Sequence, residues 1–138
     1  MDYLNMTAPC GLDCFNCPVY KANEDDKLRK KIAKNLGVPY ERAVCKGCRN
    51  ENGTIPYLYM DEPCNLYKCI TKKGYDFCHK CDDFPCDFLH PYADMATVKP
   101  HNLKIFNLCL IKKMGLEKWA KEKAKDVMRT YYKKKWEI

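Results

Sequence analysis

The sequence predicts a small, helix-rich α+β fold with metal-binding cysteine knuckles, a short β-hairpin and C-terminal helices. Three observations predict this class. Ten cysteines cluster between residues 10 and 86, an Asn-Gly pair precedes a short run of β-forming residues, and apolar residues after residue 100 recur at helical spacing. The 138 residues suit one domain, with a cysteine-rich metal-binding region over 1–98 and a basic amphipathic helical region over 99–138 packed on it.

The cysteine spacing is the strongest chemical signal in the chain. A C-x2-C pair lets two thiolates reach one metal ion across a turn, and the sequence has three such pairs. The candidate metal ligands are Cys10, Cys14, Cys17, Cys45, Cys48, Cys64, Cys69, Cys78, Cys81 and Cys86. Their number exceeds the need of two four-thiolate sites, and we expect about two zinc ions per chain.

Two pairings of these ligands are compatible with the spacing. In a sequential scheme, one zinc site uses Cys14, Cys17, Cys45 and Cys48, the other uses Cys69, Cys78, Cys81 and Cys86, and Cys10 and Cys64 are outer or alternate ligands. In a cross-braced scheme, the first pair joins the third instead. The spacing alone does not choose between them.

Disulfides are the competing explanation for 11 cysteines, because small secreted proteins are rich in them. The first residues, Met1–Met6, lack the basic and apolar regions of a secretion signal, and the cysteine count is odd. No run of residues is apolar and long enough to span a membrane. We therefore expect reduced, metal-binding thiols in a cytoplasmic protein with no membrane partner.

The donor set narrows the choice of metal. Thiolate-only sites favour zinc or iron–sulfur clusters, and widely separated C-x2-C pairs favour zinc. The motif Cys10-x3-Cys14-x2-Cys17 matches the cluster motif of radical S-adenosylmethionine enzymes, but this chain lacks the β-α alternation of their barrel. An iron–sulfur or redox protein using these three cysteines remains the alternative. Closed four-thiolate sites leave no open position for a substrate, so we expect a scaffold or interaction module with an unidentified protein partner rather than an enzyme.

Local signals predict helices over residues 18–22, 24–36 and 65–72. Asn23 and Asp61 are the expected N-caps of the second and third helices, and Gly37 and Gly74 are expected to end them. Between these helices, Asn52-Gly53 is a hairpin turn signal followed by a short strand over residues 55–60.

The last 40 residues are basic, with 12 Lys and Arg against 4 Asp and Glu over residues 99–138. Leu103, Phe106, Leu110 and Met114 form one apolar stripe, a second stripe follows Gly115, and Cys109 is expected to be a buried thiol. Trp119, Tyr131, Tyr132 and Trp136 alternate with lysines, so nucleic-acid binding through residues 112–136 is a further alternative. An amphipathic helix that docks its aromatic residues on the domain is the favoured interpretation.

Four motifs carry a family resemblance: Cys10-Gly-Leu-Asp-Cys14-x2-Cys17-Pro18-x-Tyr20, Cys45-x-Gly-Cys48, Cys64-x4-Cys69, and Cys78-x2-Cys81-x2-Phe84-Pro85-Cys86. Together they resemble the prokaryotic domain-of-unknown-function family 3795, a group of small cysteine-rich proteins. The resemblance covers about residues 8–90, with all ten cysteines in the family's order. It implies zinc binding and no established reaction.

Overall fold

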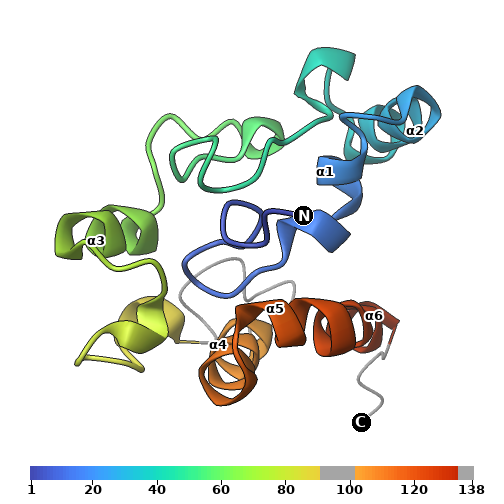
Figure 1. Ribbon diagram of the computed structural model, residues 1–138. Coiled ribbons are helices and arrows are strands. Elements are labelled where there is room, and N and C mark those ends of the chain that lie inside the picture. Colours follow the sequence, from blue (N-terminus) through green and yellow to red (C-terminus); the bar gives the residue numbers. More distant parts are fainter. Residues whose placement is uncertain (91–101, 134–138) are drawn as a thin grey trace, which may run out of the picture.

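Short helices surround a central N-terminal loop in the computed structural model, which describes residues 1–90 and 102–133 (Figure 1). The α-helices are α1 (Pro18–Lys21), α2 (Asp26–Leu36), α3 (Asn65–Lys73), α4 (Asn102–Met114), α5 (Leu116–Trp119) and α6 (Lys125–Lys133). Single 3₁₀ turns lie between them at η1 (Cys14–Asn16), η2 (Tyr40–Arg42), η3 (Pro56–Leu58), η4 (Cys78–Lys80) and η5 (Asp87–Leu89). A short π-helix, η6 (Ala120–Ala124), joins α5 to α6.

The predicted α+β class and its β-hairpin are wrong, because the described residues form helices and turns but no strand. Their β-type pairing is limited to an isolated antiparallel bridge between Thr7 and Asp13. Asn52 and Gly53 do turn the chain, with φ values of 50° and 81°. Beyond them, however, Pro56 begins η3, since proline fixes a helix-compatible φ and cannot donate to a strand ladder.

The start of α2 differs from the prediction, and its end agrees with it. Asp25, rather than Asn23, is the N-cap, and its carboxylate accepts a hydrogen bond from the Leu28 N–H at 2.9 Å. The side-chain amide of Asn23 instead donates to the Cys45 carbonyl at 2.8 Å, which ties α1 to the second cysteine pair. Gly37 ends α2 in the left-handed conformation.

The start of α3 brings a cysteine into a capping position. Cys64, rather than Asp61, is the N-cap, and its sulfur accepts a hydrogen bond from the Tyr67 N–H at 3.4 Å. Gly74 ends the helix with φ of 72°, as its sequence position predicts. Cys64 therefore stands at one end of α3, whereas Cys69 lies inside the helix.

The main core joins segments that are far apart in the sequence. Its buried members come from the N-terminal loop, α3, the turns at η4 and η5 and the C-terminal helices. They are Ala8, Cys10, Leu66, Ile70, Phe77, Cys78, Leu89, Leu108, Ile111, Trp119, Ala120 and Ala124. A smaller core is formed by Val19, Ala22, Ile32 and Ala43. The cysteine-rich segments thus pack on the C-terminal helices, while the proposed boundary between residues 98 and 99 lies outside the described residues.

The predicted apolar stripe of α4 is correct in part: Leu103 is buried, and Leu110 and Met114 pack against the main core. Phe106 is 53% exposed and Cys109 is exposed, so the expected buried thiol is wrong. The helix instead buries Asn107, whose amide donates to the Gly11 carbonyl at 2.8 Å and accepts from the Trp119 indole at 3.2 Å. An inward asparagine escapes a search for apolar stripes, which explains the error.

Trp119 is fully buried, so its ring is docked on the domain and is not available for stacking on a base. The side chains of Tyr131 and Tyr132 and all of Trp136 lie outside what the structure describes. Among the described residues, no helix has the length and apolar character needed to cross a membrane.

Candidate metal centre

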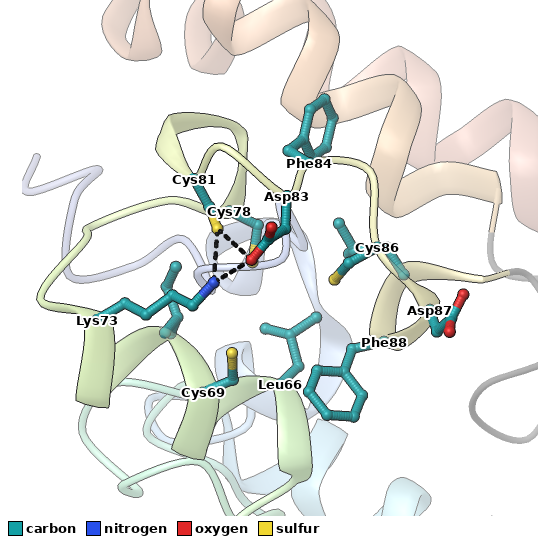
Figure 2. Close-up of a pocket in the computed structure, with 12 residues that line it drawn as sticks. Leu66, Cys69, Lys73, Cys78, Cys81, Asp83, Phe84, Cys86, Asp87 and Phe88 are labelled. Atoms are coloured by element: carbon teal, nitrogen blue, oxygen red, sulfur yellow. Dashed lines mark hydrogen bonds and ion pairs between the residues drawn. The ribbon is translucent and has the colours of Figure 1, made fainter.

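Four cysteines line one cavity of about 330 Å³ beside α3. Cys69 comes from α3, Cys78 from η4, Cys81 from the C-cap of η4 and Cys86 from the N-cap of η5. Figure 2 shows the sulfurs of Cys69, Cys81 and Cys86 pointing into the space between these segments. The structure thus places the second set of the sequential scheme around a single cavity.

Backbone hydrogen bonds hold these cysteines in place. The Cys78 N–H donates to the Pro9 carbonyl at 3.0 Å, which anchors η4 to the N-terminal loop. The Cys81 N–H donates to the Cys78 carbonyl at 3.0 Å and closes the turn that presents both thiols. Cys69 shares one face of α3 with Ile70 and Lys73, which also line the cavity.

A lysine lies among the thiols, and sequence analysis missed it. The Lys73 ammonium donates a hydrogen bond to the Cys81 sulfur at 3.1 Å and forms an ion pair with Asp83 (Figure 2). Asp83 and Cys81 raise the pKa of Lys73, and Lys73 lowers the pKa of Asp83. The only sequence signal is that Lys73 follows Cys69 by one helical turn.

The electrostatics of the cavity favour a bound cation. Burial, together with the smaller effect of the nearby Cys10, Cys86, Cys69 and Cys81 sulfurs, raises the pKa of the Cys78 thiol to about 12. Thiolates that repel one another in a buried cavity are stabilised when a dication binds among them and the thiol protons leave. The donor chemistry of the cavity therefore fits a thiophilic metal ion.

The other six of the ten clustered cysteines come from residues 10–17, the turn at residues 45–48 and the start of α3. Cys10, Cys48 and Cys64 line a second cavity of about 410 Å³. Cys17 and Cys45 pack instead against the smaller core. Gly47, between Cys45 and Cys48, lies against the Cys14 side chain, where an added Cβ would be 3.6 Å from the Cys14 sulfur. That Cys14, Cys17, Cys45 and Cys48 form one metal site stays a prediction.

All eleven cysteines lie in the described part of the chain, and none of them forms a disulfide. Within residues 1–90 and 102–133, no three His, Cys, Asp or Glu side chains are close enough together to hold a metal ion. A zinc–sulfur bond is about 2.3 Å long. Metal binding at either cavity therefore requires the sulfurs to move closer together.

A buried carboxylate lies between two of the candidate ligands. Asp13 is 1% exposed, its Oδ2 accepts a hydrogen bond from Asn16 at 2.7 Å, and its Oδ1 has no hydrogen-bond partner. Burial raises the pKa of Asp13 to about 6. Sequence analysis missed the burial of Asp13, because aspartate side chains are mostly exposed in proteins.

The family model described as "Protein of unknown function (DUF3795)" matches residues 6–91. This segment contains the ten clustered cysteines, which include all the thiols that line the two cavities. No curated protein and no solved structure matches the chain.

Proposed function

Because the chain belongs to the DUF3795 family of proteins of unknown function, we propose its role from its own chemistry: it binds zinc through thiolates and uses the metal to hold an interaction surface in shape. The observation that carries this proposal is the single cavity lined by Cys69, Cys78, Cys81 and Cys86. Four thiolates complete the tetrahedron that structural zinc prefers. Zinc is preferred to an iron–sulfur cluster because the ligands come from separate segments, two of them in a C-x2-C turn.

A four-thiolate zinc has no open position for a substrate, so the proposed role is structural and not catalytic. The metal would join α3 to the segment of η4 and η5, which contacts the main core through Phe77, Cys78, Phe84 and Leu89. Lys73, next to Cys81, would offset part of the negative charge of the metal centre. We propose a protein as the partner and the reducing cytoplasm as the compartment, where thiols stay free.

The test is the metal content of the full chain purified without oxygen. Cys69→Ser and Cys86→Ser should each lower the zinc content by about one ion per chain. Cys109→Ser is the matched control, since Cys109 is exposed on α4 and lies in neither cavity. Zinc-free wild-type protein from zinc-supplemented cells, or a Cys69→Ser variant with unchanged zinc, would refute the proposal. A brown, iron-containing protein would support the iron–sulfur alternative instead.

The structural role has its own readout. Removal of the metal by a chelator should increase amide hydrogen exchange over residues 74–90 more than over α2, which lies on the smaller core. If chelation increased amide hydrogen exchange over residues 74–90 no more than over α2, the metal would not hold this region in shape.

A further inference from the structure

One surface outside both cavities carries two arginines that stack on two exposed tyrosines. We propose that this surface, formed by Arg29, Tyr40, Arg42, Leu58 and Tyr59, docks an acidic segment of a partner protein. None of these residues lines either cavity, and α2, which carries Arg29, lies apart from α4, α5 and α6 (Figure 1). The inference therefore goes beyond the proposed zinc binding and does not depend on it.

Arg29 is fixed between α2 and the turn at η2. Its Nε donates to the Tyr40 carbonyl at 2.9 Å, and its Nη2 donates to the Glu41 carbonyl at 3.2 Å. The guanidinium carbon lies 4.0 Å from the centre of the Tyr40 ring, in a cation–π arrangement. Because the side chain is already held in one orientation, a partner that binds it pays less for ordering it.

Arg42 is fixed in the same way between η2 and η3. Its Nη1 donates to the Pro56 carbonyl at 3.1 Å, and its guanidinium carbon lies 4.2 Å from the centre of the Tyr59 ring. Tyr59 has φ of 52°, a left-handed conformation that is uncommon for a bulky residue, and it is 51% exposed. Backbone strain of this kind is concentrated at binding and active sites. Leu58, which precedes Tyr59, is also exposed and adds apolar area to the surface.

The positive charge of both arginines is left uncompensated. Their partners are neutral carbonyl oxygens and rings, and within residues 1–90 and 102–133 neither arginine forms an ion pair. The carboxylate of Asp26 is instead bound by Lys30 at 2.7 Å and by the Tyr40 hydroxyl at 2.5 Å. Most N–H donors of each guanidinium also lack an acceptor in this part of the chain. Planar guanidinium groups with open donors suit carboxylates, which accept two parallel N–H bonds.

The arrangement favours an acidic protein segment over a nucleic acid. Nucleic acids bind mainly through several phosphate contacts, and the exposed carboxylates of Asp26 and Glu41 would repel a continuous phosphate chain at this surface. Spaced carboxylates on a protein segment can reach the two guanidinium groups and avoid these acids. Arginine and tyrosine are also among the residue types that contribute most to binding energy between proteins.

The experiment titrates the full chain, under anaerobic reducing conditions, into a fluorescein-labelled peptide of glutamates around one central leucine. We expect saturable binding that weakens as salt rises and is about tenfold tighter than binding of the same peptide with glutamine in place of glutamate. Fluorescence anisotropy measures both affinities. Amide chemical-shift changes caused by the glutamate peptide in the wild-type chain should map to residues 26–42 and 56–59.

Two double variants separate the guanidinium geometry from the net charge. Arg29→Lys with Arg42→Lys keeps the charge but loses the planar donors, and should weaken peptide binding about tenfold. Lys118→Gln with Lys123→Gln is the matched control, because these exposed lysines of α5 and η6 lie outside the surface. The control removes two charges and should nevertheless keep the wild-type affinity.

Three results would overturn the proposal. They are equal affinities for the glutamate and glutamine peptides, chemical-shift changes confined to residues 102–133, and tighter binding of oligothymidylate than of the glutamate peptide, which would indicate a nucleic acid instead. The shift mapping needs only wild-type protein, so it decides the question even if the arginine variant fails to fold. Cys69→Ser should bind the peptide as the wild type does, so a failed zinc site and a failed docking surface are separate results.

Discussion

Replacing Gly11 with alanine tests how closely the Cys10–Cys14 loop is fitted to α4. Gly11 has φ of +88°, a region that disfavours residues with a Cβ atom. An added Cβ would lie 2.9 Å from the Lys104 carbonyl oxygen and 3.1 Å from the Leu108 side chain. Because the nearest atom belongs to the helix backbone, it cannot rotate away, and the loop must move instead.

The expected loss in the free energy of unfolding has two parts. The left-handed backbone costs about 1 kcal/mol with alanine. Movement of the loop also breaks the buried hydrogen bond from Asn107 to the Gly11 carbonyl, which costs about 1–3 kcal/mol because the asparagine is left unpaired. We expect a total of about 3 kcal/mol for Gly11→Ala.

Gly37→Ala is the matched control. Gly37 also has a positive φ, of +65°, but a Cβ atom there would meet no atom within 4 Å. This variant should therefore lose only about 1 kcal/mol. Urea unfolding of both metal-loaded proteins, with unchanged denaturant dependence, measures the difference. Equal losses for the two variants would refute the close contact between the loop and α4.

Three further predictions concern α3 to α5. Trp119→Phe should cost about 1–3 kcal/mol in the free energy of unfolding, since Asn107 loses its indole donor; an unchanged urea midpoint would contradict this. Lys73→Met should weaken zinc binding about tenfold in a competition titration, whereas Lys73→Arg should keep most of the affinity. Equal zinc affinities for the two variants would show that the positive charge of Lys73 does not stabilise the metal centre. In the metal-loaded protein, a thiol reagent should label exposed Cys109 first, as measured by mass spectrometry, and early labelling of Cys78 would contradict the burial of the first cavity.

Helices with strong local signals were predictable from the sequence. Gly37 and Gly74 end α2 and α3 at the expected positions, because a left-handed cap depends only on adjacent residues. The hairpin prediction failed because the Asn52-Gly53 turn is used to place Cys48 against Cys64, not to pair strands. The buried face of α4 was predicted only in part, because Asn107, which lies inward beside the apolar residues, is polar.

The candidate site was predictable in its residue types but not in its grouping. Spacing alone suggests that Cys45 and Cys48 share one ion, but it does not show which other thiols would join them. Long-range bonds such as that from Cys78 to Pro9 decide which thiols meet, and no local pattern encodes them. Whether these thiols bind zinc stays a prediction.

The shared core has a consequence for the order in which the protein is assembled. The family match ends at residue 91, but Leu108, Ile111 and Trp119 cover the same core as Ala8 and Cys10. During synthesis, every clustered cysteine is made before α4 and leaves the ribosome before α4 does. The cysteine segments must therefore await their apolar cover, and a fragment cut at residue 91 would leave that surface open to water and prone to aggregate.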